Sequence, residues 1–225
     1  MFHRLTLALL ATFALAGAHA ADAPHTADAP HPQVRITTNN GSILIELYPD
    51  RAPLTVANFL RYVRAGQYSQ TLIHRVIPNF LIQGGGFTAD GKVKPTQASI
   101  ANESGNGLQN RRGWVGLART TEPHSGNSQF YINTADNPDL DPMPVRWGYA
   151  VFGKVIDGMD VVDHISTVPA GSTGVFEKDS PLTPVIIEKV EIVDPATAAA
   201  STIAAPDAPQ RLAQPPGSGA VQSPN

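Results

Sequence analysis

Residues 73–87 have the sequence IHRVIPNFLIQGGGF, which predicts two short apolar strands joined by a turn. We expect the strands to cover Thr71 to Ile77 and Phe80 to Gln83, with Pro-Asn as a turn or bulge signal between them. Because side chains alternate along a strand, Arg75 faces away from its two neighbours. A guanidinium among apolar strand residues is costly to bury, so Arg75 is a candidate functional residue.

Three interpretations of Arg75 and the glycines at 84–86 are open at this point. Arg75 could form an ordinary salt bridge at a strand edge, with the glycines making a loop. The glycines could bind phosphate, although neither Gly-Lys-Ser/Thr nor a G-x-G-x-x-G helix start follows them. Alternatively, Arg75 points at a bound carbonyl in a pocket lined by Phe80, Leu81 and Gln83.

The N-terminal segment is typical of a secretory signal peptide. Residues 1–20 carry Arg4 near the start, an apolar run over 5–16, and Ala18-His19-Ala20 as an A-x-A cleavage site. An uncleaved N-terminal anchor is the alternative, although the run is short for a membrane span. With cleavage near Ala20 and no cysteine in the chain, a bacterial periplasm or the exterior is the expected compartment.

Two further segments are expected to stay outside the folded unit. Residues 21–33 form a near-repeat rich in Pro and Ala that favours a flexible leader over loose metal binding by His25 and His31. Residues 194–225 are a Pro/Ala-rich tail with too little large apolar surface to fold, and we expect them to be disordered. The folded unit is therefore predicted to span residues 34–193.

Composition argues against several classes of function. Removing residues 1–20 lowers Lys+Arg from 16 to 15 against 19 acidic residues, so the formal charge changes from −3 to −4. This mild acidity gives no electrostatic footprint for nucleic acid, and no later segment approaches the roughly 20 apolar residues of a membrane span. The histidines at 74, 124 and 164 lie in unrelated contexts, so neither a metal nor another cofactor is expected.

The folded unit has mostly β character. A hairpin with an Asn-Gly turn is predicted over residues 34–48. Further strands are predicted over 114–118, 129–133, 149–155 and 185–193. Apolar spacing predicts helices after Pro53 and over 158–166, the first with Asn58, Arg61 and Arg64 on its polar face. Strands do not alternate regularly with helices, so a closed antiparallel barrel with helices over its ends is the expected fold.

A second distinctive run, SGNSQFYIN, occupies residues 125–133. Together with residues 73–87, 114–118 and 149–155, it resembles the cyclophilin-type peptidyl-prolyl cis-trans isomerases, most closely their exported bacterial branch. The resemblance covers residues 34–193 with these blocks in the expected order. It implies a mainly β fold, a closed eight-stranded antiparallel β-barrel capped by two α-helices, with a substrate groove on its outer surface.

The resemblance also implies roles for individual residues. Arg75 matches the catalytic arginine of the family's F-H-R-x-I-P-x-F motif. Substrate-binding positions are matched by Phe80, Leu81, Gln83, Ala118, Arg119, Gln129, Tyr131, Leu140 and Tyr149. The implied activity is rotation about X-Pro bonds by a monomer, without metal or cofactor, on proline-containing peptides and unfolded exported proteins. A proline-peptide-binding or chaperone module with little turnover is the alternative, and a carbohydrate- or nucleotide-binding barrel rests only on the glycines.

Several positions depart from the family pattern. Ile73 stands where Phe usually opens the motif, and Tyr149 takes a place often held by His. Tyr131 replaces a common Phe, which adds a hydroxyl that must find a partner or water. Asp139 precedes Leu140 where cyclosporin-binding eukaryotic members generally carry Trp, so we expect a different groove rim.

Overall fold

The structure is a computed structural model that describes residues 31–193. The predicted signal peptide at 1–20, most of the predicted leader at 21–33 and the predicted tail at 194–225 lie outside the described residues. Within residues 31–193, no helix is both long enough and apolar enough to cross a membrane.

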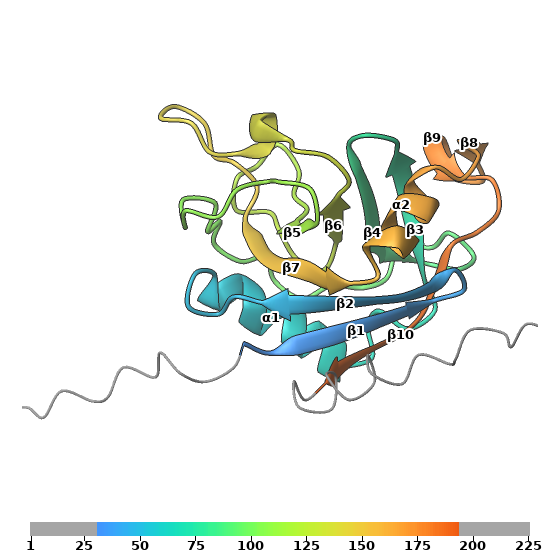
Figure 1. Cartoon of the computed structure of the whole chain (residues 1–225), viewed down its shortest axis with the longest axis horizontal. Coiled ribbons are helices and arrows are strands. Elements are labelled where there is room, and N and C mark those ends of the chain that lie inside the picture. Colours follow the sequence, from blue (N-terminus) through green and yellow to red (C-terminus); the bar gives the residue numbers. More distant parts are fainter. Residues whose placement is uncertain (1–30, 194–225) are drawn as a thin grey trace, which may run out of the picture.

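Eight strands close into an antiparallel barrel in the order β1-β10-β3-β4-β6-β5-β7-β2 (Figure 1). Their bounds are β1 Gln33–Thr38, β2 Gly41–Leu47, β3 Thr71–Ile77, β4 Leu81–Thr88, β5 Trp114–Leu117, β6 Phe130–Asn133, β7 Val151–Asp157 and β10 Ile186–Val193. The predicted eight-stranded barrel is confirmed, and the Asn-Gly turn joins β1 to β2 as expected. The glycines at 84–86 lie inside β4, so the interpretation that they form a loop is wrong.

The barrel interior is filled by the inward-facing side chains of its strands. The largest of these are almost fully buried: Ile36, Ile43, Ile45, Leu47, Ile82, Phe130, Ile132 and Phe152. Burying each such side chain contributes about 1.5–3 kcal/mol relative to leaving it exposed. Phe59 closes the barrel from α1 (Pro53–Arg64), because its ring lies 5.6 Å from that of Phe130 and 5.1 Å from that of Phe152.

Two helices, α1 and α2 (Met159–Ser166), lie at the predicted positions. α1 begins with a proline in its first turn and ends before Gly66, whose N–H donates to the carbonyl of Val63 at 3.0 Å. The prediction for Asn58 was wrong: the residue is only 3% exposed. Its Nδ2 donates to the carbonyl of Asn127 at 2.6 Å, which ties α1 to the segment that leads into β6.

A two-stranded sheet, β8 (Ala170–Thr173) and β9 (Phe176–Pro181), lies outside the barrel and was not predicted. Figure 1 shows this hairpin beside β3, and β9 contacts that strand. The Phe176 ring lies 5.6 Å from the His74 ring and 4.9 Å from the Phe87 ring. The hairpin is therefore anchored to the barrel by an aromatic cluster next to Arg75.

Candidate active site

Strand register places Arg75, Gln83, Tyr131 and Gly116 in one row across β3, β4, β6 and β5. Arg75 pairs with Gln83, Gln83 with Tyr131, and Tyr131 with Gly116. A sequence neighbour of each of these residues belongs to the hydrophobic core of the barrel. Because side chains alternate across a sheet, the row faces outward, as a groove on the outer surface requires.

Arg75 is half-exposed and is held from two sides. Its Nη1 lies 3.4 Å from Oε1 of Gln83, and its Nε lies 3.8 Å from Oδ2 of Asp179 on β9. The interpretation that Arg75 forms a salt bridge is therefore correct, because Asp179 is its acidic partner. In the described part of the chain, Nη2 of Arg75 has no hydrogen-bond partner, which leaves this donor free for a ligand.

A second polar side chain extends the row. Nε2 of Gln83 donates to Oε1 of Gln129 at 2.9 Å, and the carbonyl of Gln129 accepts from the backbone N–H of Ala118 at 2.9 Å. A Cβ at position 86 would collide with the side chain of Gln129, so Gly86 is needed to make room for it. Asp179, Arg75, Gln83 and Gln129 therefore form a continuous line of polar groups over the outer face.

Tyr131 is almost fully buried, with 2% of its surface exposed. Its ring lies over Gly116, where a Cβ would collide with the ring. The Tyr131 hydroxyl donates to Oδ1 of Asn110 at 2.5 Å, so the added hydroxyl has a protein partner. Burial raises the pKa of Tyr131 well above its ordinary value, and the nearby Tyr149 and Asp141 act in the same direction.

A cluster of asparagine side chains lies around the hydroxyl of Tyr131. Asn110 donates to Oδ1 of Asp141 from its backbone N–H at 2.7 Å and from Nδ2 at 2.9 Å. Asn137 donates from Nδ2 to the carbonyl of Phe80 at 2.8 Å and to Oδ1 of Asn133 at 2.7 Å. No site role was predicted for these residues: Asn110 and Asn137 lie outside the strands and Asn133 ends β6, so only their hydrogen-bonding chemistry could have indicated them.

Apolar walls stand beside the row. Leu81 is 4% exposed, whereas Phe80 and Leu140 are half-buried, the latter at the end of the 3-10 helix η1 (Pro138–Leu140). The backbone N–H of Tyr149 donates to the carbonyl of Leu140 at 2.9 Å. The rings of Tyr149 and Tyr131 meet edge to face at 6.0 Å. These contacts place Leu140, Tyr149 and Tyr131 next to one another, while Leu81 begins β4, the strand that pairs with β6.

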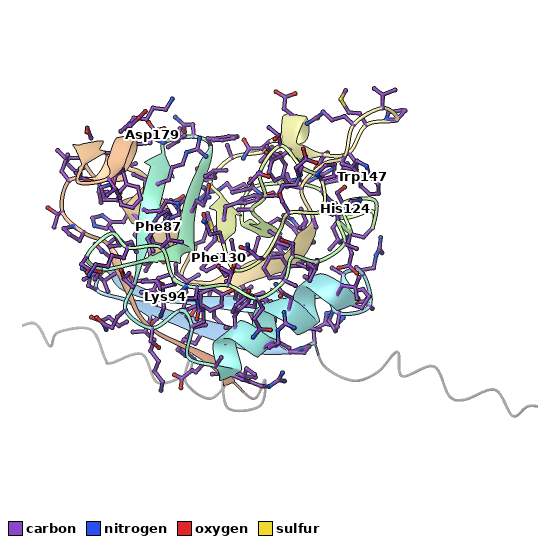
Figure 2. The ribbon with its side chains drawn as sticks, turned by 180° about the vertical axis from the view of Figure 1, so that it is seen from behind. Phe87, Lys94, His124, Phe130, Trp147 and Asp179 are labelled. Carbon is purple, nitrogen blue, oxygen red and sulfur yellow. The ribbon has the colours of Figure 1, made fainter. Side chains whose placement is uncertain are left out.

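The Arg119 side chain contacts both the loop before β7 and the predicted pocket residue Tyr149. Its Nε donates to the carbonyl of Gly148 at 3.1 Å and its Nη2 to that of Trp147 at 2.7 Å. The guanidinium also lies 4.3 Å from the centre of the Tyr149 ring. The Arg119 side chain therefore holds the loop before β7. This loop is remote from the partner of Arg75, because Figure 2 shows Trp147 and Asp179 at opposite sides of the molecule.

His74 and Asp179 lie next to Arg75 but were not among the predicted site residues. Asp179 adopts a positive φ of 58, which is uncommon for a non-glycine residue. Burial lowers the pKa of His74 to about 4, with a smaller contribution from the charge of Arg75, while a backbone hydrogen bond at Leu72 opposes the shift. His74 is therefore a neutral packing residue at neutral pH.

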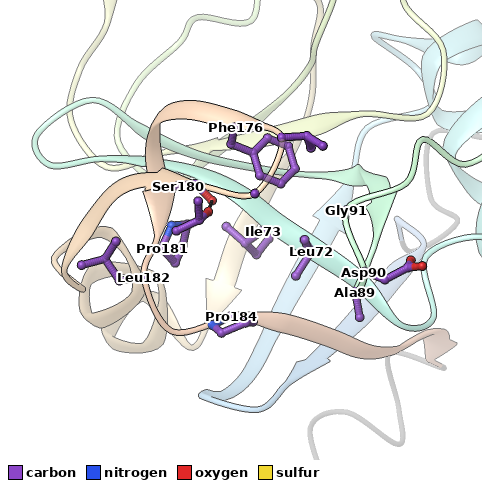
Figure 3. Close-up of a pocket in the computed structure, with 13 residues that line it drawn as sticks. Leu72, Ile73, Ala89, Asp90, Gly91, Phe176, Ser180, Pro181, Leu182 and Pro184 are labelled. Atoms are coloured by element: carbon purple, nitrogen blue, oxygen red, sulfur yellow. Dashed lines mark hydrogen bonds between the residues drawn. The ribbon is translucent and has the colours of Figure 1, made fainter.

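A cavity of about 270 Å³ lies between the β8–β9 hairpin and β3 (Figure 3). Leu72 and Ile73 line it from β3, and Phe176 and Leu182 line it from the hairpin side. It contains none of the predicted site residues. Over residues 31–193, no group of three or more His, Cys, Asp or Glu residues is placed to hold a metal ion.

Known proteins share both the sequence and the fold of this chain. Residues 33–192 match the family described as "Cyclophilin type peptidyl-prolyl cis-trans isomerase/CLD". A peptidyl-prolyl cis-trans isomerase from Acinetobacter baylyi is 52% identical over 159 residues, which cover 71% of this chain and 84% of that protein. Peptidyl-prolyl cis-trans isomerase B from Escherichia coli is 49% identical over 162 residues, covering 71% of this chain and 98% of the relative.

A solved structure of a cyclophilin-type isomerase is also similar to this chain, at lower sequence identity. The cyclophilin-type isomerase of Cryptosporidium parvum, solved in the presence of the dipeptide Ala-Pro, is similar with a TM-score of 0.60 and 28% identity. The likeness covers 72% of this chain and 99% of that structure.

Proposed function

The chain belongs to the cyclophilin-type peptidyl-prolyl cis-trans isomerases and catalyses rotation about X-Pro bonds, and we propose that Arg75 is its catalytic residue and that its substrates are exported proteins. One observation carries the assignment of Arg75. Its half-exposed guanidinium shares an outward-facing row with Gln83 and Tyr131 and keeps one donor nitrogen free.

The reaction itself explains why an arginine suits this position. Rotation about an X-Pro bond breaks amide resonance, with a barrier of about 18–20 kcal/mol, and makes no covalent bond. In the twisted state the proline nitrogen becomes pyramidal and regains its lone pair. Arg75 donates to this nitrogen more strongly in the twisted state than in the planar one, and the difference lowers the barrier.

Apolar and amide side chains complete the site. Phe80, Leu81, Leu140 and the Tyr131 ring hold the pyrrolidine ring while the preceding carbonyl turns. Burying one proline ring contributes only about 1–2 kcal/mol by area. The Gln83–Gln129 hydrogen bond uses Nε2 of Gln83, which leaves the Gln129 amide nitrogen to bind the peptide backbone. Binding is accordingly weak and depends little on sequence beyond the proline.

The N-terminal sequence supports a role in the bacterial periplasm. Residues 1–20 have the charge, apolar run and A-x-A site of a secretory signal, and the exported bacterial branch of the family is the one that the motifs resemble. Unaided proline isomerisation takes tens of seconds or more, which delays the folding of newly exported chains. A catalyst with low sequence selectivity meets this need.

A protease-coupled assay with proline tetrapeptides tests the assignment of Arg75. Arg75→Ala should lower kcat/KM by at least about 100-fold, equivalent to about 2.7 kcal/mol of transition-state stabilisation. Arg35→Ala is the matched control, because Arg35 is also a half-buried strand arginine but lies on β1. Near-full activity of a folded Arg75→Ala protein would overturn the assignment of Arg75, whereas an absence of turnover by the unaltered protein would favour a binding module.

Expression of the full chain in a bacterium tests the compartment. We expect the protein in the periplasmic fraction, with Ala21 as its first residue by N-terminal sequencing. Ala20→Arg should block cleavage, because small residues are required at this position. Recovery of the unaltered protein in the cytoplasm with residues 1–20 still attached would contradict an exported role.

A further inference from the structure

The loop at residues 142–147, here called the rim loop, exposes large apolar side chains next to the candidate groove. Val145 is 96% exposed, Met143 58% and Trp147 47%. Figure 1 shows the segment between η1 and β7 standing out from the barrel. A hollow of about 410 Å³ lies between the rim loop and Ser104 and Gly105. Clusters of exposed apolar side chains commonly mark an interaction site.

Hydrogen bonds fix the shape of the rim loop. Met143 and Arg146 exchange both backbone hydrogen bonds, at 2.9 and 3.0 Å, so Pro144 and Val145 form the tip of a tight turn. Nη2 of Arg146 donates to the carbonyl of Asp139 at 2.7 Å and to that of Asp141 at 3.2 Å. The backbone that carries the exposed side chains is therefore held in one conformation, which reduces the entropic cost of ordering the loop when a ligand binds.

The rim loop is continuous with the candidate groove. It starts just after Leu140 and ends just before Tyr149, both predicted pocket residues, whose backbones bond to each other at 2.9 Å. Arg119, a third predicted groove residue, donates to the carbonyl of Trp147. An extended peptide advances about 3.3–3.6 Å per residue, so we expect side chains a few positions from a bound proline to come within reach of this loop.

We propose that the rim loop is an accessory binding surface for apolar side chains of an unfolded polypeptide substrate, a few residues away from the proline that is isomerised. The proposal rests on the proposed function of the groove. Met143 and Trp147 suit this role because an unbranched thioether adapts to different partners and an indole gives a large rigid contact. The rim loop would lower KM for long apolar substrates without changing the catalytic step, while tetrapeptides are too short to reach it.

Two sets of peptides test the proposal with the purified protein. One set has thirteen residues with a central proline and either Leu and Val or Ser and Thr at the outer positions, and the other consists of proline tetrapeptides. The test variant is Met143→Ser with Val145→Ser, which keeps the Trp147 ring and the Arg119 contacts. The matched control is Val93→Ser with Val175→Ser, which removes two exposed valines, 70% and 69% exposed, away from the rim loop.

The unaltered protein should show a KM about five- to tenfold lower for the apolar thirteen-residue peptide than for the polar one. The rim-loop variant should lose most of this preference, whereas the control variant should keep it, and all three should turn over tetrapeptides equally. Urea unfolding of each variant checks the fold, and Val145→Ser alone replaces the double variant if that is unstable. A preference that is absent from the unaltered protein, or that survives in the rim-loop variant, would overturn this inference. Failure to turn over tetrapeptides would instead count against the proposed function.

Discussion

Asp179 of β9 places its Oδ2 3.8 Å from Nε of Arg75 on β3. The carboxylate reaches the guanidinium because the β8–β9 hairpin packs on β3 through Phe176 and His74. Asp179 adopts the left-handed region of φ, which Asp reaches more readily than most non-glycine residues because its short polar side chain can hydrogen-bond locally. The packing of the hairpin therefore fixes the position of this carboxylate beside Arg75.

We expect Asp179→Asn to lower kcat by about two- to fivefold with little change in KM. The ion pair is partly exposed, and such pairs contribute at most about 1 kcal/mol, so the loss is limited to a less well oriented guanidinium. Glu177→Gln, an exposed acid on the same hairpin, is the control for the change in charge. An unchanged kcat for Asp179→Asn would show that Gln83 alone orients Arg75.

Arg75→Lys should recover less than about tenfold of the activity lost in Arg75→Ala. The guanidinium contacts Gln83 through Nη1 and Asp179 through Nε, and still has Nη2 free. One ammonium cannot present donors in this fixed fork. The measurement is kcat/KM with a proline tetrapeptide, and activity close to that of the unaltered protein would show that positive charge suffices.

Tyr131→Phe should destabilise the protein by about 1–2 kcal/mol, because the buried Oδ1 of Asn110 loses its short hydrogen bond. Tetrapeptide turnover should change little, since the ring that packs on Gly116 is kept. Urea denaturation measures the loss. Tyr48→Phe is the control, because its hydroxyl bonds Glu46 at a partly exposed position where water replaces the lost partner.

Stability should fall as the pH drops from about 6.5 to about 4, with His74 as one cause. The folded pKa of His74, about 4, is below its unfolded value, so the unfolded state binds more protons in this window and is favoured as pH falls. Ion-pair hydrogen bonds lower the pKa of Asp90 and Asp163, so these groups titrate at lower pH still.

The variant His74→Phe isolates this effect because it keeps a ring beside Phe87 and Phe176 and removes the titratable group. Its unfolding free energy should depend less on pH between 6.5 and 4 than that of the unaltered protein. His164→Gln on the surface of α2 is the control. An equal pH dependence in all three proteins would exclude His74 as the cause.

Cyclosporin should inhibit this isomerase poorly, and Asp139→Trp should improve inhibition by about thirtyfold, near 2 kcal/mol. Asp139 is exposed in η1, and its carbonyl, rather than its side chain, holds Arg146. Its carboxylate offers no apolar area and would lose water against an apolar macrocycle. An inhibition constant compares the unaltered protein, Asp139→Trp and the remote control Asp160→Trp. Nanomolar inhibition of the unaltered protein would show that Asp139 does not take the position at which other family members contact cyclosporin.

Local patterns determined most of the secondary structure of this protein. Alternating apolar residues, the Asn-Gly turn and the 3.6-residue spacing after Pro53 placed the barrel strands and both helices within a few residues. The β8–β9 hairpin was not predicted, because its glycines and the polar residues around Lys178 show no alternation of apolar and polar side chains. The hairpin packs on β3 through Phe176. Asn58 has the spacing of a polar helix face, but contact with Asn127 buries it.

The candidate site was likewise predicted in part from the sequence and decided in part by the tertiary structure. The sequence by itself determined that an arginine, two glutamines and apolar side chains occur in family motifs, because these are properties of short runs. Only the tertiary structure decided that Arg75, Gln83 and Tyr131 form one row, since register depends on which strands pair. It also decided that Asn110 and Asp179 join them, because residues far apart in sequence meet only when the chain has closed the barrel.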